Sequence, residues 1–194
     1  MSRADRDKWN ERYRGGAYAD REHPTALLAD WLSRLPRGRA LDVACGAGRN
    51  ALFLAAAGYA VDALDISAIG LELGRTAATR LGLAVGWHCL DLEEDPGALP
   101  RGPYDLIVWV RYVNAALWRP LVERLAPGGH LLCEQHLETT AEVVGPSTTA
   151  FRLAPLELRR AATGLEVVHY HEGLVVDPDG RTAALAQLIA RRPA

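Results

Sequence analysis

The sequence predicts an α/β fold with a doubly wound, mostly parallel sheet of seven strands that ends in an antiparallel hairpin. Three observations support this prediction: strand-like and helix-like stretches alternate, a glycine-rich turn follows the first strand, and the last two strands are too close in sequence to enclose a helix. A chain of 194 residues, 49% of them hydrophobic, suffices for one domain with its own core. We expect a single domain over 1–194, with N-terminal helices forming a lid over 1–36 and the sheet core over 37–194.

Seven stretches have the composition of strands. Five of them are separated by helix-like segments and are expected to be parallel: residues 39–43, 59–64, 83–89, 104–110 and 129–135. Two more, residues 164–172 and 182–190, are joined by GLVVDPDGR, which is too short for a crossover helix. These last two strands should therefore pair antiparallel.

Prolines and polar residues mark the ends of the helices between the strands. Pro24 can open a first helix, and Ser67 is a candidate N-cap of the helix over residues 67–82. Pro120 interrupts the helical pattern of residues 115–129, so that helix should be kinked or in two pieces.

The N-terminal segment also has helical features. Ser2 and Asp5 have the spacing of a capping box, and Trp9 and Tyr13 are i, i+4 neighbours on one helical face. This aromatic pair can form a lid over a cofactor, or it can pack against the edge of the sheet.

Charge and cysteine content exclude several classes of protein. A formal net charge of −2 gives no general attraction to nucleic acid, and no apolar run is long enough to span a membrane. The charged N-terminus lacks the apolar region of a secretory signal. Cys45, Cys89 and Cys133 lie far apart without a C-x-x-C motif, which argues against disulfides or structural zinc. We therefore expect a cytoplasmic protein with a small-molecule partner, without nucleic acid or membrane; its oligomeric state stays open.

The stretch RALDVACGAGRN, residues 39–50, carries the main functional signal. Gly46, Gly48 and Ala51 match G-x-G-x-x-A, in which glycines let the backbone approach a ligand and the next helix offers free N–H groups. The motif alone is weak, because tight turns use glycine for their own sake. Asp42 decides between ligands: a carboxylate is unfavourable beside a pyrophosphate but suits the ammonium and sulfonium of S-adenosylmethionine.

Acidic residues follow the second and third predicted strands. Asp65, in ALDIS, can accept hydrogen bonds from a ribose diol, which suits either type of nucleotide, or it can cap the next helix. Asp91, in HCLDLEED, can accept from an adenine amino group or belong to a solvated acidic loop. His169 and His171 share a strand face but lack a third ligand, so no metal is expected.

Polar residues at other strand ends are candidates for the chemistry. Glu134 and His136 stand two apart at the end of the fifth strand and can act as base and orienter, or form a polar strand end in water. Arg111 and Arg181 can hold an anionic group of the cofactor or the acceptor, or be exposed or salt-bridged arginines. Arg49, just after the glycine turn, is a further candidate for the cofactor carboxylate, or it has a structural role.

Taken together, these residues resemble the class I S-adenosylmethionine-dependent methyltransferases. The family loop D/E-x-G-x-G-x-G reads DVACGAG here, with Ala44 in place of the first glycine, a mild departure that is acceptable if Ala44 keeps a negative φ. Asp65, YDLI in the fourth strand, LAPGG before the fifth and the closing hairpin are also similar to this family, whose fold is Rossmann-like. A dinucleotide-binding dehydrogenase lacks that hairpin.

A narrower resemblance is to the tellurite-resistance-type methyltransferases. It rests on LDVACGAGRNALFLAAAGYAVDALDIS, FRLAPLELRR and DGRTAALAQLIARR, while DKWNERY looks like a related bacterial branch of unassigned substrate. The tellurite-resistance enzymes have a longer hairpin with a His-Arg pair, where this chain has Val175 and Val176 and retains only Arg181. The resemblance therefore indicates the fold and the cofactor and leaves the acceptor open.

The resemblance also implies roles for individual residues. Asp42 would position the cofactor's ammonium, and Asp65 would hold the ribose hydroxyls. The other implied cofactor contacts are Ala44, Cys45, Gly46 and Gly48 along the methionine portion, Ile66, Asp91 and Leu92 around the adenine, and Val110 and Arg111 near the methionine group.

We therefore predict a methyltransferase that converts S-adenosylmethionine to S-adenosylhomocysteine and methylates a small acceptor, soft or anionic in character. Because no obligatory base is visible, a non-catalytic S-adenosylmethionine-binding module is one alternative. A NAD-binding Rossmann oxidoreductase is the other, and it would have to tolerate a pyrophosphate beside Asp42.

Overall fold

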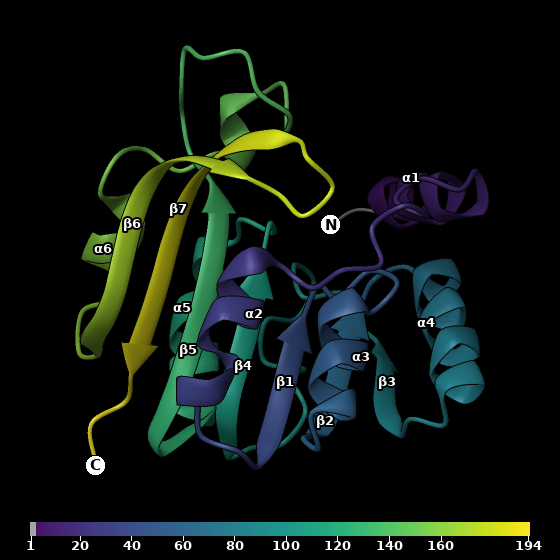
Figure 1. Ribbon diagram of the computed structural model, residues 1–194, viewed down its shortest axis with the longest axis horizontal. Helices are drawn as coiled ribbons and strands as arrows, with labels where there is room; N and C mark the ends of the chain where they lie inside the picture. Colours follow the sequence, from purple (N-terminus) through teal and green to yellow (C-terminus); the bar gives the residue numbers. More distant parts are fainter. Residues whose placement is uncertain (1–2) are drawn as a thin grey trace.

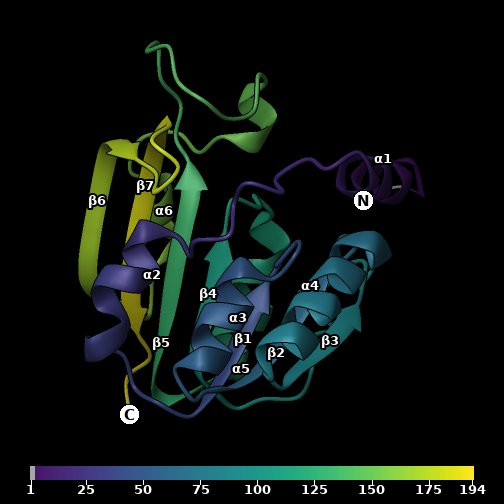
Figure 2. The same ribbon diagram turned by 45° about the vertical axis from the view of Figure 1, so that its right-hand side comes forward.

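A computed structural model describes residues 3–194, so Ser2 of the expected capping box lies outside the described residues. The chain forms a central sheet with helices on both faces (Figure 1). Helices α2 (Ala26–Trp31), α3 (Arg49–Ala56) and α4 (Ala68–Leu81) cover one face, and α5 (Trp118–Arg124) and α6 (Glu157–Ala161) cover the other (Figure 2). None of the helices in this part of the chain is long and apolar enough to cross a membrane.

The sheet has seven strands in the order β3-β2-β1-β4-β5-β7-β6. Strands β1 to β5 run parallel, whereas β7 is antiparallel to both β5 and β6, which confirms the predicted fold class. The strand bounds are β1 Arg39–Val43, β2 Ala60–Asp65, β3 Val85–Cys89, β4 Tyr104–Val110, β5 Leu125–His136, β6 Glu166–Val176 and β7 Thr182–Arg191.

The helix ends follow from local chemistry. Ser67 caps α4 as predicted, because its Oγ accepts a hydrogen bond of 3.0 Å from the amide of Gly70. Pro120 lies in the first turn of α5, where a missing N–H is tolerated, and the 3₁₀ turn η2 (Ala115–Leu117) precedes it. The expected helical pattern over residues 115–129 is wrong at its end: β5 begins at Leu125, since Pro127 and the left-handed Gly128 cannot continue a helix. Two further 3₁₀ turns are η1 (Leu32–Arg34) and η3 (Thr149–Phe151).

The alternation of β1 sets the direction in which its acidic side chain points. Leu41 and Val43 pack into the core on the α5 and α6 side, whereas Ala40 packs with Leu54 of α3 on the other side. Asp42 must share the face of Ala40, because successive strand residues point to opposite faces. The carboxyl group is therefore buried between the sheet and α3, directly before the glycine turn.

Three segments lie beyond the carboxyl ends of the parallel strands. Helix α1 (Arg3–Arg14) rests on the start of α4, where Asn10 Oδ1 accepts from the Ser67 hydroxyl at 2.8 Å and from the Ile69 amide at 3.3 Å. The tip of the β6–β7 hairpin bends over the same edge, and residues 138–152 extend away above β5 (Figure 1). Residues 15–25, the N-terminal strap, connect α1 to α2 across this edge.

The packing of Trp87 gives a test of the fold. A Cβ at Gly74 of α4 would lie 2.5 Å from the Trp87 ring and 3.0 Å from the Ala47 carbonyl oxygen. We therefore expect Gly74→Ala to lower the free energy of unfolding by about 1–3 kcal/mol, although alanine favours a helix. Leu73→Ala, at an exposed neighbouring position, should change it far less. Urea denaturation measures both, and a more stable Gly74→Ala variant would contradict this packing.

Candidate functional site

The loop after β1 turns the chain sharply into α3. Its residues Ala44, Gly46 and Gly48 have φ angles of +55°, +58° and +82°, and the Gly48 amide donates to the Cys45 carbonyl at 2.9 Å. The condition of a negative φ at Ala44 is therefore not met. The turn requires the left-handed conformation at the position where the family has its first glycine, and alanine adopts it at a cost of about 1–2 kcal/mol.

Asp42 lies beneath this loop and is 1% exposed. Its Oδ2 has no hydrogen-bond partner among the described residues. Burial raises the pKa of the Asp42 carboxyl to about 7, although the Ala51 amide and the charge of Arg49 oppose the shift. A buried carboxyl with a free oxygen is suited to a cationic group, which would hold it in the ionised form.

Asp65, at the end of β2, connects the two halves of the site. Its Oδ2 accepts from the Gly46 amide and its Oδ1 from the Ser67 amide, both at 2.8 Å. Burial raises the pKa of the Asp65 carboxyl, and these hydrogen bonds only partly offset that effect. Each oxygen keeps a further lone pair, so the group can still accept from the two hydroxyls of a ribose.

A pocket opens at this edge of the sheet and contains about 510 Å³ of space, including its mouth. Asp65 and Arg111 are the charged groups in a wall that is otherwise largely apolar and aromatic. The lining residues are Trp9, Tyr13, Ala44, Leu64, Asp65, Ile66, Leu90, Leu92, Arg111 and Tyr112.

Seven of the residues predicted from the sequence are thus brought together, namely Trp9, Tyr13, Ala44, Asp65, Ile66, Leu92 and Arg111. Sequence reasoning missed Leu64, Leu90 and Tyr112. The signal was present for all three, since each directly precedes or follows a predicted site residue or strand end. The predicted residues Asp42, Cys45, Gly46, Gly48, Arg49, Asp91 and Val110 lie around the pocket but do not line it.

The neighbours of these outer residues show what they do in the protein. Cys45 Sγ lies 3.7 Å from the Gly46 carbonyl oxygen, and Val110 is buried in the core. Asp91 accepts from the Glu93 amide at 3.1 Å and lies 3.7 Å from the guanidinium of Arg6. The pairing with Arg6 joins α1 to the segment after β3, at the side where the adenine was expected.

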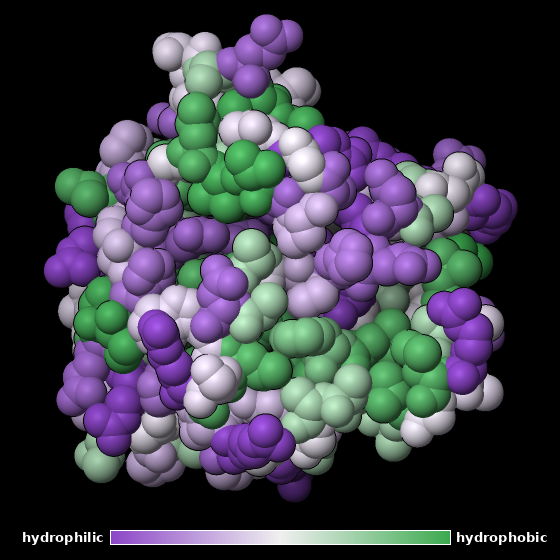
Figure 3. All heavy atoms as spheres, in the orientation of Figure 1, coloured by the Kyte–Doolittle hydropathy of each residue, from purple (hydrophilic) through white to green (hydrophobic). Residues whose placement is uncertain are grey.

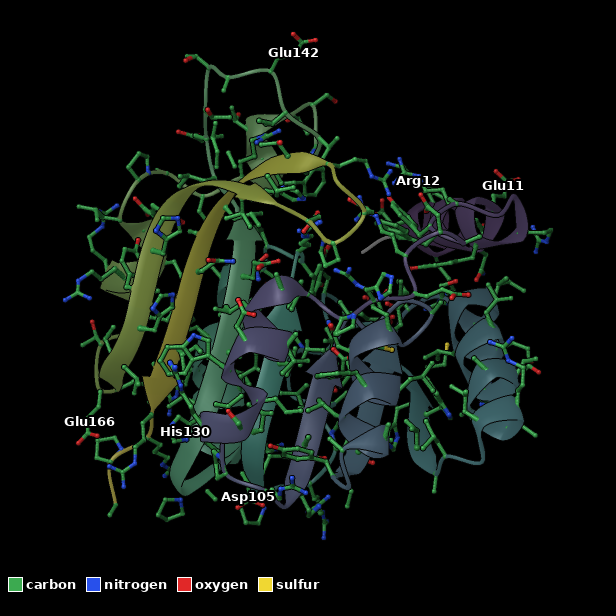
Figure 4. All side chains as sticks on the ribbon, in the orientation of Figure 1. Glu11, Arg12, Asp105, His130, Glu142 and Glu166 are labelled. Carbon is green, nitrogen blue, oxygen red and sulfur yellow. The ribbon has the colours of Figure 1, made fainter. Side chains whose placement is uncertain are left out.

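Helix α1 presents aromatic side chains to the pocket and charged ones to solvent. The rings of Trp9 and Tyr13 are 6.3 Å apart, and Tyr13 packs so closely on the loop that a Cβ at Gly46 would lie 2.2 Å from its hydroxyl. Burial is the main cause that raises the pKa of Tyr13. Glu11 and Arg12 point away from the sheet (Figure 4), and the outer surface of α1 is mainly hydrophilic (Figure 3). This placement supports the lid, which stays a prediction.

Arg111, at the end of β4, is held by acidic groups from two other segments. Its Nη2 donates to Asp177 Oδ1 at 2.5 Å and to Glu134 Oε1 at 3.3 Å. Glu134 also accepts from the Thr25 hydroxyl and from the Gln187 amide, both at 2.8 Å. With both oxygens engaged, Glu134 positions Arg111 and is poorly placed to remove a proton from an acceptor.

His136 and Arg181 occupy different environments. His136 is 8% exposed, and burial together with the charges of Arg111 and Arg152 lowers its pKa to about 4, so its ring is neutral at neutral pH. No hydrogen bond connects it to Glu134 in the described part of the chain. Arg181 lies at the hairpin tip, pairs with Asp179 at 2.6 Å and with Asp20 at 3.1 Å, and does not line the pocket.

Comparison with known proteins identifies this architecture. Residues 40–129 match the family model described as a methyltransferase domain. This part of the chain, just under half of it, is similar to a methyltransferase domain. The matched range covers the glycine loop, Asp65 and Arg111, so the domain contains most of the pocket described above. No curated protein matches the chain by sequence.

Solved structures share the methyltransferase fold. TehB from Haemophilus influenzae superimposes with a TM-score of 0.75 and 22% identity, over 91% of this chain and 66% of that protein. This chain thus spans just under two thirds of the length of TehB. A structure described by the conversion of a disulfide bond into a thioacetal group during echinomycin biosynthesis gives a TM-score of 0.76 and 20% identity, over 97% and 92% of the two chains.

A third structure relates the fold to its cofactor. Magnesium protoporphyrin IX methyltransferase (ChlM) from Synechocystis PCC 6803, with bound S-adenosylmethionine, has a TM-score of 0.64 and 18% identity over 86% of this chain and 76% of that one. The Rossmann-like fold of a methyltransferase is confirmed by these structures, and the domain match agrees with the predicted class of S-adenosylmethionine-dependent methyltransferases.

The left-handed Ala44 leads to a stability prediction. Ala44→Gly should raise the free energy of unfolding by about 0.5–1 kcal/mol, because glycine adopts this conformation without a Cβ clash. Ala47→Gly is the matched control in the same loop, where φ is not positive, and it should lower stability by a similar amount. Urea denaturation of both variants measures the difference, and equal effects would contradict the strain.

The buried Asp42 makes stability depend on pH. Because its pKa is about 7 when folded and near 4 when unfolded, the unfolded state loses its proton first, so this group reduces stability as pH rises from 4 to 7. Asp42→Asn should therefore stabilise the protein by about 1–4 kcal/mol at pH 8, with a smaller gain as pH falls toward 4. Chemical denaturation across this range is the measurement. A stability difference that does not change with pH would contradict the shifted pKa.

Proposed function

We propose that the protein transfers the methyl group of S-adenosylmethionine to a small-molecule acceptor whose nucleophile is soft or anionic. The observation that carries the proposal is the pair of buried carboxyls at the ends of β1 and β2, Asp42 with a free oxygen and Asp65 on the pocket wall, joined by the glycine loop. A cation beside Asp42 and a diol beside Asp65 match the two polar parts of this cofactor.

The remaining walls fit the rest of the cofactor. Ile66, Leu90 and Leu92 offer an apolar surface for an adenine ring, and Trp9 and Tyr13 cover the mouth. A dinucleotide fits less well, because its pyrophosphate would lie near Asp42, which is ionised above pH 7. When bound, S-adenosylmethionine supplies a methyl group on a sulfonium, which leaves as a neutral thioether.

The protein itself contributes to methyl transfer by positioning the reacting groups and by excluding water from them. The aromatic and apolar walls keep water from the reacting groups, and Arg111 fixes the side of the pocket at the end of β4. Glu134 is engaged by three hydrogen-bond donors, so this carboxylate is not free to act as a base. An acceptor that is already anionic, or readily deprotonated like a thiol, needs no base. This favours a soft or anionic nucleophile.

The structural neighbours support the same class of acceptor. One neighbour is described by the conversion of a disulfide bond into a thioacetal group, a reaction at sulfur, and TehB is a methyltransferase of the tellurite-resistance type. Their identities to this chain, 20% and 22%, support a shared fold, and the acceptor remains part of the proposal.

Calorimetric titration tests the cofactor. S-adenosylmethionine and S-adenosylhomocysteine should bind in the micromolar range, and Asp65→Asn should weaken both about 10-fold or more, because charge-assisted hydrogen bonds to the ribose are lost. Asp105→Asn is the matched control, since Asp105 lies at the opposite edge of the sheet (Figure 4), where it accepts from the Arg39 amide. Binding of NADH without binding of the adenosyl compounds would contradict the proposal.

Methyl transfer is then tested by mass spectrometry against a panel of thiols, carboxylates, selenite, tellurite and amines. Methylated thiol or anionic acceptors, but not amines, are the expected products. Tight cofactor binding with no transfer to any member of the panel would instead indicate a binding module without catalysis.

A further inference from the structure

Three arginines from separate segments lie near one another, and one of them, Arg111, lines the pocket. They are Arg21 of the N-terminal strap, Arg49 at the start of α3, and Arg111 at the end of β4. Arg49 Nη1 donates to the carbonyl of His23 at 3.2 Å, which places it against the strap two residues from Arg21. The hairpin tip links the other two, because Asp177 binds Arg111 at 2.5 Å and Asp179 lies 3.5 Å from Arg21.

Several donors in this arginine cluster lack a hydrogen-bond partner. Arg111 Nε, Arg111 Nη1 and Arg21 Nε are buried nitrogen atoms for which the described part of the chain offers no acceptor in hydrogen-bonding geometry. A buried donor left unpaired costs about 1–3 kcal/mol, and more when it is charged. Three such donors at one place call for a ligand with acceptor atoms.

The carboxylates at this place are unevenly distributed over the arginines. Arg111 faces two carboxylates, Glu134 and Asp177. Asp179 is shared between Arg21 and Arg181, and Arg181 also pairs with Asp20. Within residues 3–194 no carboxylate lies within ion-pair distance of Arg49. Burial and the positive charges of Arg111 and Arg21 lower the pKa of Arg49, so the guanidiniums lie close enough to repel one another. Arg49 thus has no ion pair in this part of the chain, and Arg111 keeps two buried donors without an acceptor.

We propose that the methyl acceptor carries a carboxylate or a comparable anionic oxygen group, held between Arg21 and Arg111. This inference rests on the proposed function, and it specifies the charge of the acceptor and the residues that bind it. Arginine suits the role, because its planar guanidinium matches the oxygen pair of a carboxylate. Arg111 lines the pocket, so a group bound there brings the acceptor's nucleophile to the end of the pocket where the methionine portion was expected.

The same arrangement gives the N-terminal strap a part in acceptor binding. Arg21 reaches the site only when the strap lies across the sheet edge. Thr25 anchors the strap there, because its hydroxyl donates to Glu134 at 2.8 Å and its amide donates to Asn50 Oδ1 at 3.0 Å. Arg49, next to the glycine loop, remains for the carboxylate of the cofactor's methionine portion. The anionic group of the acceptor and the carboxylate of the cofactor are thus bound by different arginines.

The test is a calorimetric titration of the protein saturated with S-adenosylhomocysteine. Mercaptoacetate, a small thiol with a carboxylate, should bind, and its uncharged methyl ester should bind at least 10-fold more weakly. Arg21→Gln should weaken mercaptoacetate at least 10-fold while S-adenosylhomocysteine binding is unchanged, which also shows that the variant is folded. Arg14→Gln removes an exposed arginine at the end of α1 and is the control for the change of charge.

A second pair of ligands separates the acceptor's anion from the cofactor's. Methylthioadenosine lacks the amino-acid portion of S-adenosylhomocysteine. A variant that loses a contact with the cofactor carboxylate therefore binds S-adenosylhomocysteine more weakly but binds methylthioadenosine as before. If Arg21→Gln does this, the cluster serves the cofactor and the inference is overturned. If the protein binds S-adenosylhomocysteine but not mercaptoacetate, this inference is overturned and the proposed function still stands. If it binds no adenosyl compound, the proposed function and this inference are both overturned.

Discussion

The hydrogen bond from the Gly46 amide to Asp65 is the contact on which the site depends. It joins the turn after β1 to the end of β2, and thereby fixes the shape of the loop over which a ligand must lie. The same carboxyl also accepts from the Ser67 amide at the start of α4. One side chain therefore sets the relative position of two strands, the loop and a helix. The strain at Ala44 and the burial of Asp42 are accommodated because this framework is rigid.

A second group of contacts brings the remaining walls to the same edge. Glu134 receives Thr25 from the N-terminal strap, Gln187 from β7 and Arg111 from β4. Four segments far apart in sequence, its own strand included, thus converge on one buried carboxylate. Such a group is costly to bury unless all its oxygens are engaged, and here they are. The walls nearest the acceptor are consequently positioned by polar contacts, whereas those around the adenine are apolar.

Much of the fold was predictable, because buried parallel strands have near-continuous apolar sequences and the hairpin loop is too short for a helix. Asp65 and Ser67 were found for similar local reasons, since each ends a strand or begins a helix. The sequence carried no local sign of Arg21, whose place depends on where the strap crosses the sheet. Arg181 was expected near the acceptor but extends to the hairpin tip, and the φ of Ala44 follows from the turn rather than from alanine itself.

Helix α1 supplies two aromatic walls of the pocket, yet it is attached mainly through Asn10 and Tyr13 to the start of α4 and the loop. A ligand enclosed by Trp9 and Tyr13 would thus have an apparent affinity scaled by the fraction of molecules in which this helix is docked. By the same linkage, a bound ligand would hold α1 in place and shield it from proteases. The helix and the pocket are in this respect a single cooperative unit.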